Sequence, residues 1–134
     1  MSRQQLLDDV ACVIEGNGFE ESSDGLPFTY QRNVRYPSII DGKRDTAHFL
    51  LHTRDGSIQL VVKYQEVNGT AIEKLGYTAL DANRTPHQQY LVVCGGDKLL
   101  SQGIDFLNDR KSIAPKLHAL DVHELDELIP NLVH

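Results

Sequence analysis

The stretch that decides the fold runs from residue 45 to residue 65 and has the sequence DTAHFLLHTRDGSIQLVVKYQ. Two runs rich in β-branched and aromatic residues, 45–52 and 58–65, flank the tripeptide RDG at 54–56. A short polar segment that ends in glycine, placed between two such runs, is typical of a three-residue hairpin loop. The stretch therefore predicts an antiparallel β-hairpin.

The loop also predicts how the two strands pair. If Thr53 pairs with Ser57, counting outward places Leu51 opposite Gln59, Phe49 opposite Val61, Ala47 opposite Lys63, and Asp45 opposite Gln65. Because side chains alternate between faces, these residues share one face of the hairpin, and the other face carries His48, Leu50, Leu60 and Val62. Asp45 and Lys63 are then diagonal neighbours with Cβ atoms about 7 Å apart. A slip of one residue would set the two on opposite faces.

The rest of the sequence predicts a larger α/β domain around this hairpin. Hydrophobic periodicity and turn residues predict helices over 3–15, 70–82 and 97–111 and a short one from 121, with strands over 28–36, 89–94 and 116–122 and a polar loop over 20–27. A strand, helix, strand order implies a right-handed parallel crossover. We therefore predict a single domain over 1–134, with a mixed sheet flanked by helices on both faces.

The composition is that of an ordinary globular protein. Hydrophobic residues make up 40% of the chain and charged residues 24%, which argues against disorder. No apolar run approaches the roughly 20 residues that cross a bilayer, and the first residues do not resemble a secretory signal. Cys12 and Cys94 lie in apolar stretches without metal-ligand spacing, so we expect reduced core cysteines and a cytoplasmic protein.

The formal net charge of −6 argues against a protein that coats nucleic acid nonspecifically, because such proteins need broad positive surfaces. A local basic groove remains compatible with this charge. Its candidate residues form one group before the hairpin and one near the C-terminus: Arg32, Arg35, Lys43 and Arg44, and Arg110, Lys111 and Lys116. The alternative is that all of these are solvated surface charges.

The order of the predicted elements resembles the common core of the PD-(D/E)XK, or restriction-endonuclease-like, nuclease superfamily. Asp45, which enters a strand after the turn GKR at 42–44, is similar to that superfamily's first acidic motif. The sequence VVKYQ at 61–65, followed by GTAIEKL at 69–75, resembles a branch that has E-x-K-x-Q and then G-S/T-x-x-E-K. The likeness covers residues 5–95. It implies an αβββαβ core, here with an additional C-terminal strand and helix.

The resemblance also implies a function: a metal-dependent endodeoxyribonuclease that hydrolyses DNA phosphodiester bonds with Mg²⁺ or Mn²⁺. Asp45 would hold the metal ion, and Lys63 would orient or help deprotonate the attacking water. Gln65 would support the water or the neighbouring strand. Glu15 stands where related nucleases keep a helical glutamate near the metal. The expected partners are DNA and a second copy of the chain, because two-fold symmetry suits an enzyme that grips both strands. No nucleotide cofactor and no membrane partner are expected.

One position departs from the pattern of the superfamily. Its second acid stands two residues before the lysine, where this chain has Val61. The replacements within reach are Glu15, Gln59, Glu66 and Glu73, and the sequence does not choose among them. The departure favours an alternative function, a catalytically degenerate module that binds DNA or a protein partner.

Several residues of the predicted site also have a purely structural interpretation. Asp45 and Lys63 could form a cross-strand salt bridge, and Glu73 could complete the capping box that begins at Thr70. His48 and His52 share a strand face but lack a third zinc ligand. The GGD sequence at 95–97 is more typical of a tight turn than of a phosphate-binding loop.

Overall fold

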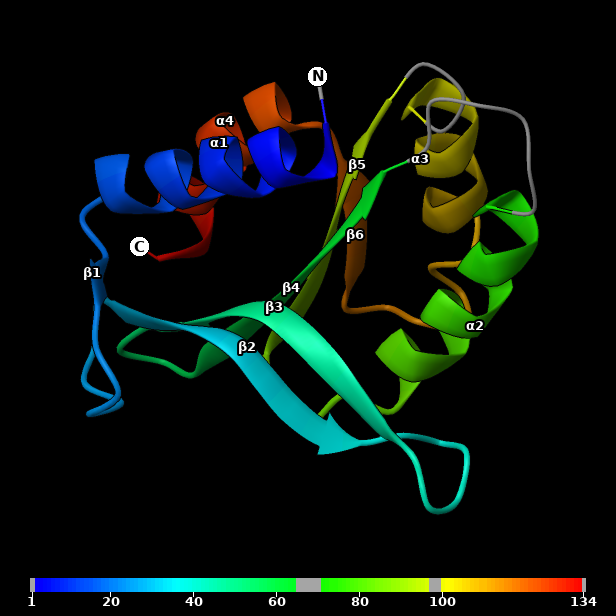
Figure 1. The fold of residues 1–134 in the computed structure, drawn as a ribbon, viewed down its shortest axis with the longest axis horizontal. Coiled ribbons are helices and arrows are strands. Elements are labelled where there is room, and N and C mark those ends of the chain that lie inside the picture. Colours follow the sequence, from blue (N-terminus) through cyan, green and yellow to red (C-terminus); the bar gives the residue numbers. More distant parts are fainter. Residues whose placement is uncertain (1, 65–70, 97–99, 134) are drawn as a thin grey trace.

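The fold is built on one mixed sheet with helices on both of its faces (Figure 1). This computed structural model describes residues 2–64, 71–96 and 100–133. The strands, in their order across the sheet, are β1 (Glu20–Glu21), β2 (Thr29–Pro37), β3 (Arg44–His52), β4 (Ser57–Tyr64), β5 (Gln89–Gly95) and β6 (Leu117–Leu120). The helices are α1 (Arg3–Gly16), α2 (Ala71–Asn83), α3 (Leu100–Asn108) and α4 (Val122–Leu132).

The predicted αβββαβ core with a C-terminal strand and helix is confirmed. Strands β2, β3 and β4 pair antiparallel, whereas β4, β5 and β6 pair parallel through the crossover helices α2 and α3. One element was missed: β1 pairs parallel with β2 inside the segment 20–27 that the sequence predicted to be a loop. Among the described residues, no helix combines the length and the apolar character that a bilayer span requires.

Two hydrophobic clusters, one on each face, hold the helices to the sheet. The first joins α1 and α4 to a face that includes Phe49, Leu60 and Val62. The second joins α2 and α3 to the opposite face, which includes Val61 and Val92. The face of β4 on which a residue lies therefore decides which pair of helices it meets.

The two cysteines differ in their surroundings. Both thiols are free, and Cys94 is buried in the cluster beneath α2 and α3, as expected. Cys12 is exposed on α1, so the expectation of a core position is wrong for this residue. Position 12 lies on the outer side of a helix whose inner side carries Leu6, Val10 and Ile14.

The predicted hairpin forms, but its predicted register is wrong by one residue. Phe49 lies opposite Leu60, and not opposite Val61. Phe49 therefore shares the α1 face with Leu60 and Val62, which the sequence had predicted to lie on the other face. Val61 instead faces α2, and Lys63, two residues further along the strand, continues the same row.

Thr53 accounts for the changed register. Its hydroxyl donates to the Gly56 carbonyl and accepts from the backbone N–H groups of Asp55 and Gly56. A threonine that caps a loop in this way cannot also extend the strand. The last pair of the hairpin is therefore His52 with Ser57, and every pair beyond it moves by one position.

Strand β3 parts from β4 after this short pairing and continues with β2 as a two-stranded ribbon. Its pairing with β4 ends at Phe49, whereas its pairing with β2 extends to Arg44 opposite Pro37. Ribbons of two strands twist more strongly than wider sheets, and Asn33 in β2 adopts a positive φ of 54°. Figure 1 shows the ribbon leaving the sheet on the side where α2 lies.

The twist of this ribbon decides where Asp45 lies. Regular alternation from Phe49 would set Asp45 on the α1 face, away from Lys63. Asp45 keeps its regular partner Tyr36 in the ribbon, yet both side chains form hydrogen bonds with residues of α2. The one-residue slip therefore does not separate Asp45 from Lys63.

Candidate functional site

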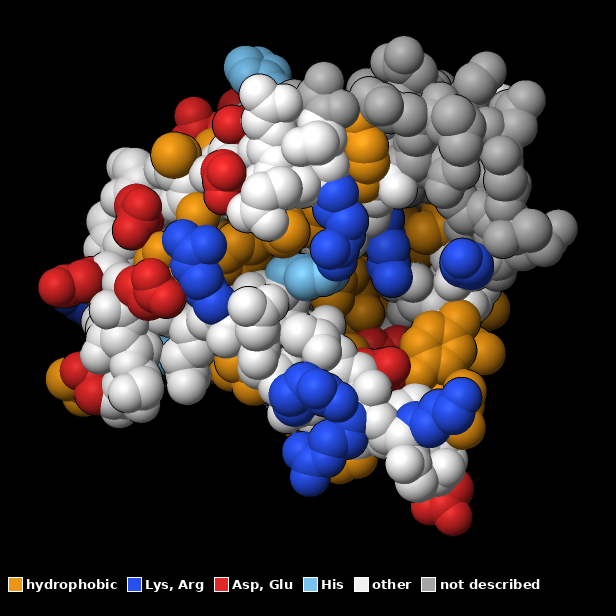
Figure 2. Space-filling view, in the orientation of Figure 1, with side chains coloured by type: hydrophobic (Ala, Val, Ile, Leu, Met, Phe, Trp, Pro, Cys, Tyr) orange, Lys and Arg blue, Asp and Glu red, His pale blue; other side chains and the backbone are white. Residues whose placement is uncertain are grey.

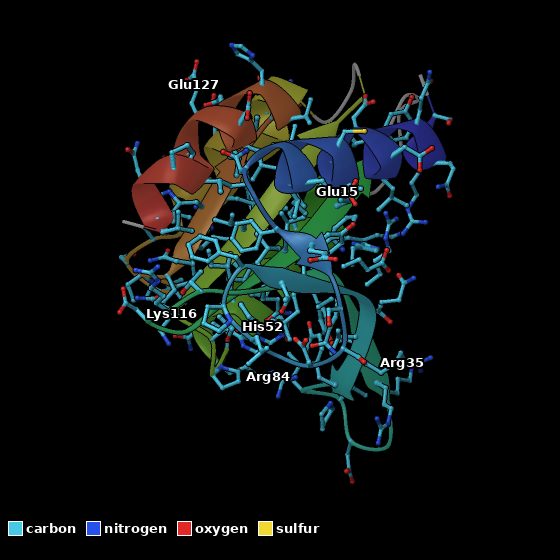
Figure 3. The ribbon with its side chains drawn as sticks, turned by 90° about the vertical axis from the view of Figure 1, so that its left-hand side faces the viewer. Glu15, Arg35, His52, Arg84, Lys116 and Glu127 are labelled. Carbon is cyan, nitrogen blue, oxygen red and sulfur yellow. The ribbon has the colours of Figure 1, made fainter. Side chains whose placement is uncertain are left out.

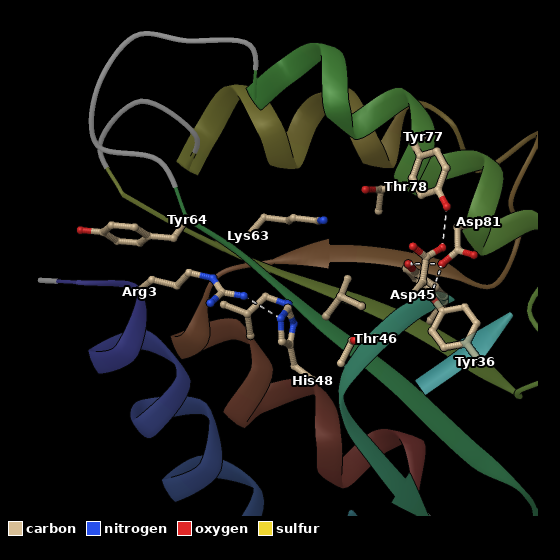
Figure 4. A pocket seen from close by; sticks show the side chains of 13 residues that line it. Arg3, Tyr36, Asp45, Thr46, His48, Lys63, Tyr64, Tyr77, Thr78 and Asp81 are labelled. Atoms are coloured by element: carbon tan, nitrogen blue, oxygen red, sulfur yellow. Dashed lines mark hydrogen bonds between the residues drawn. The ribbon is translucent and has the colours of Figure 1, made fainter. Parts of the chain in front are cut away.

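A cavity of about 320 Å³ lies where β3 parts from β4, and α2 borders it (Figure 4). It collects side chains from α1, α2 and four strands, and the residues that matter below are Arg3, Tyr36, Asp45, His48, Val61, Lys63, Tyr77, Asp81 and Tyr90. Figure 2 shows the cavity as a hollow in which acidic side chains lie deep and basic side chains lie around them. An electropositive rim around carboxylates suits an anionic ligand whose charge is shared with a metal ion.

Asp45 lies at the ribbon side of this cavity, held by α2. Its Oδ2 atom accepts a hydrogen bond from the Tyr77 hydroxyl, which also bonds Ser38 Oγ at 2.7 Å. Loss of solvent and the adjacent Asp45 carboxylate raise the pKa of Tyr77, so this phenol stays protonated and donates. The carboxylate is thereby fixed to α2 while it keeps further acceptor positions.

Lys63 enters the same cavity from β4. Burial lowers the pKa of its ammonium, the Asp45 carboxylate opposes that effect, and the positive charge of Arg3 adds to it. A lysine with a lowered pKa exchanges its proton more readily near neutral pH than a surface lysine does. The described residues contain no salt bridge between Asp45 and Lys63, so the structure does not support the alternative of a simple cross-strand ion pair.

Asp81 is a second carboxylate in this cavity, and the sequence reasoning missed it. It belongs to α2 and is only 3% exposed. Its Oδ2 atom accepts from the hydroxyl of Tyr90 at 2.8 Å and from that of Tyr36, and its Oδ1 atom accepts from Arg84 Nε at 3.3 Å. Burial and the Asp81 charge raise the pKa of both tyrosines. No motif in the sequence singled this residue out.

His48 has a donor at each ring nitrogen. The Val62 backbone N–H lies 2.8 Å from Nδ1, and the Arg3 guanidinium lies 2.9 Å from Nε2. Burial, Arg3 and Lys63 lower the pKa of His48 to about 4, so the ring is neutral and has a single acceptor nitrogen. The Val62 backbone N–H donates to Nδ1 at 2.8 Å, the shorter of the two contacts. The tautomer of the ring decides which of the two donors, Val62 N–H or Arg3, it accepts from.

Of the four residues predicted to be catalytic, the cavity unites Asp45 and Lys63. Glu15 does not line it: this residue lies in the last turn of α1, and its Oε2 atom accepts from the Tyr30 hydroxyl at 3.1 Å (Figure 3). Gln65 lies outside the described residues, as do Glu66 and the side chain of Glu73.

The place of the missing acid is part of this cavity. Val61 lines it and is 4% exposed, so the strand carries an apolar side chain where the superfamily carries a carboxylate. Gln59 lies on the same face of β4 but is buried, and its Oε1 atom accepts from Thr85. Within the part of the chain that the structure describes, no three His, Cys, Asp or Glu side chains gather as a metal centre.

Comparison with known proteins adds one match. Residues 1–133 match the family model described as PD-(D/E)XK nuclease superfamily domain. No curated protein and no solved structure matches the chain.

Proposed function

The chain belongs to the PD-(D/E)XK nuclease superfamily, and on that premise we propose that it is a metal-dependent deoxyribonuclease. The observation that carries this proposal is the shared cavity of Asp45 and Lys63, which the two residues reach from strands that are not paired at these positions. A carboxylate and an ammonium in one half-enclosed site are the groups that hydrolysis of a phosphodiester requires.

The residues of the cavity fit a divalent metal ion. Members of this superfamily typically use such ions, and Mg²⁺ takes one or two carboxylates together with water and substrate phosphate oxygens. Asp45 has capacity for it, since Tyr77 occupies one of about four acceptor positions of its carboxylate. The ion would neutralise developing negative charge and lower the pKa of a bound water.

The chain's own residues would hold and polarise the substrate. The Lys63 ammonium lines the same cavity as Asp45 and would contact a phosphate bound there, and its lowered pKa suits proton exchange with water. Arg3 adds a guanidinium at the opening of the same cavity. A guanidinium binds two phosphate oxygens at once, so Arg3 would fix the orientation of the phosphodiester.

A plasmid-cleavage assay with Mg²⁺ or Mn²⁺ tests the proposal. We expect the unmodified protein to cut DNA, and Asp45→Asn and Lys63→Met each to lower the rate by roughly 10²-fold or more. Glu15→Gln is the matched control, because this carboxylate lies outside the cavity and its variant should cut normally. Absence of cutting, or an Asp45→Asn variant as active as the unmodified protein, would contradict the proposal.

Val61 favours a second candidate function, a catalytically degenerate module that binds DNA or a protein partner. An apolar, buried side chain at the place of an acid is what loss of catalysis predicts. Under this alternative the unmodified protein binds DNA in a salt-dependent way without cutting it, and Val61→Glu confers cleavage. The cleavage assay and a binding titration on the same DNA distinguish the two candidates.

We also propose that the protein acts as a homodimer in the cytoplasm. Two-fold symmetry would let two small domains engage both strands of a duplex. The two free cysteines are compatible with a reducing compartment. Sedimentation of the protein with and without a short DNA duplex tests the homodimer: a monomer under both conditions would contradict it.

A further inference from the structure

We propose that Asp81 supplies the second carboxylate of the metal site, from α2, in place of the acid that β4 lacks at Val61. This inference rests on the proposed function and adds to it a residue that lies outside the sequence motif. It places the two metal-binding carboxylates on the ribbon and on the helix.

The position of Asp81 in the cavity supports this assignment. Asp81 and Val61 both line the cavity that contains Asp45 and Lys63, and Figure 4 shows Asp45 and Asp81 at the same end of it. Both carboxylates act electrostatically on the Lys63 ammonium and on the Tyr77 hydroxyl. A helix residue thus provides negative charge where the strand residue provides none.

Two carboxylates lie together at this end of the cavity (Figure 4). Asp81 is almost fully buried, and burial of a carboxylate is costly unless charge and hydrogen bonds compensate it. Its partners on the cavity side are the neutral hydroxyls of Tyr36 and Tyr90, while Arg84 pairs with its other oxygen and is 37% exposed. Two carboxylates that share a site repel each other, and a divalent ion between them would relieve this repulsion.

Asp81 also has the capacity to bind an ion. A carboxylate offers about four acceptor positions, of which Tyr36, Tyr90 and Arg84 occupy three. The remaining position is on Oδ1, the oxygen that pairs with Arg84, and an ion bound at Oδ2 would displace one of the two tyrosine hydroxyls. Tyr36 and Tyr77 donate to Asp81 and Asp45 respectively, so hydroxyl groups fix the direction of both carboxylates before any ion binds.

Binding of Mn²⁺ alone to the full chain, measured by the electron paramagnetic resonance of free Mn²⁺, tests the inference without any assay of activity. We expect Asp81→Asn to weaken Mn²⁺ binding at least tenfold and Asp105→Asn to leave it unchanged, because Asp105 is exposed on α3 outside the cavity. The double variant Asp81→Asn/Val61→Glu returns a carboxylate to β4 and should restore the affinity. Thermal unfolding confirms that each variant is folded.

The outcomes separate this inference from the proposed function. If Asp45→Asn abolishes Mn²⁺ binding while Asp81→Asn binds as the unmodified protein does, the assignment of Asp81 is overturned and the metal site at Asp45 stands. A folded double variant that stays at the affinity of Asp81→Asn also overturns the assignment, because Asp81 would then act on the structure alone. Failure of the unmodified protein to bind Mn²⁺ overturns both proposals.

A second variant keeps the test decisive if Asp81→Asn does not fold. Tyr90→Phe removes one hydroxyl from Asp81 Oδ2 and leaves the carboxylate in place. An acceptor position becomes available, so Mn²⁺ binding should tighten. Unchanged binding in a folded Tyr90→Phe protein overturns the assignment.

Discussion

His48 shows how a single ring in this cavity depends on pH. The ring accepts the Val62 backbone N–H, and its burial among the charges of Arg3 and Lys63 lowers its pKa from 6.5 to about 4. Between these two values the unfolded chain binds a proton that the folded protein excludes. The contribution of His48 to stability is therefore complete above about pH 6.5 and is lost as the pH falls toward about 4.

This loss of stability at low pH leads to a prediction for His48→Asn. An asparagine can still accept from Val62 but does not titrate. Between about pH 6.5 and about pH 4, we expect the free energy of unfolding of the unmodified protein to fall by about 1–2 kcal/mol more than that of the variant, a value reduced by the partial exposure of the ring. Urea titrations at both pH values provide the measurement. Identical pH dependence in the two proteins would contradict the neutral, accepting ring.

Arg3 is the residue whose loss should change binding but not folding. Arg3 is exposed, so the loss of its contact with the His48 ring in Arg3→Gln should cost little stability. We expect DNA affinity to fall about tenfold, the loss of one charge-assisted contact, while the melting temperature stays within experimental error. Anisotropy titrations measure the affinity. Arg110→Gln is the control, because Arg110 stacks on Phe106 and does not line the cavity.

Among the elements, α1 must lie close to the sheet to carry Arg3 into the cavity. The contact that sets this closeness is Gly95 at the end of β5, where an added Cβ would lie 2.5 Å from Leu6 Cδ2. Leu6 is 1% exposed, so it has little room to move aside. A glycine here lets a helix residue pack directly on the strand backbone.

Two glycine substitutions of the same kind should therefore have opposite effects. Gly95→Ala overpacks the contact with Leu6, and we expect it to lower the free energy of unfolding by about 1–3 kcal/mol. Gly76→Ala lies inside α2, where nothing is within 4 Å of the added Cβ, and should raise that energy by about 0.5–1 kcal/mol through helix propensity. Chemical denaturation compares the two. Equal changes in the free energy of unfolding would mean that Leu6 of α1 does not pack closely against Gly95.

The elements were predictable from the sequence, whereas their exact pairing was not. Local patterns are sufficient for helix α1 and strands β3 and β4, because hydrophobic periodicity is a property of neighbouring residues. The register depended on whether the Thr53 side chain would continue β3 or cap the loop, and both are common for threonine. The position of Asp45 depended on the twist of a ribbon that has left the sheet, which no local pattern encodes.

At the scale of the whole molecule, only those site residues that belong to the superfamily's motif could be predicted from the sequence. Asp45 and Lys63 followed from a spacing that the chain shares with a superfamily. Asp81 did not, because it reaches the cavity from α2 and its tyrosine partners come from two separate strands, β2 and β5. Parts of the chain that are distant in sequence meet there, and the sequence alone does not show which residues come into contact.

The distribution of charge over the molecule leads to the last prediction. Although the net charge is −6, acidic side chains gather over α1, whereas basic ones lie around the cavity and along the ribbon (Figure 2). The ribbon and the loop that joins its two strands carry three exposed basic residues near Asp45: Arg35, Lys43 and Arg44. A DNA strand that places a phosphate beside Asp45 would run along this ribbon. The ribbon, and not the protein as a whole, would then provide the electrostatic attraction.

Removing the three basic side chains together therefore tests where DNA lies. We expect the triple variant Arg35→Ala/Lys43→Ala/Arg44→Ala to weaken DNA binding and to reduce the slope of log affinity against log salt by up to about 3, since each phosphate contact contributes about one. The matched control removes Lys111 and Lys116, which contact His118 and the carbonyls of Thr85 and His87 and do not line the cavity. Its salt slope should equal that of the unmodified protein. The opposite result, a slope reduced by the control and not by the ribbon variant, would place the DNA on the β6 side of the molecule and remove the support that the ribbon gives to a nuclease site at Asp45.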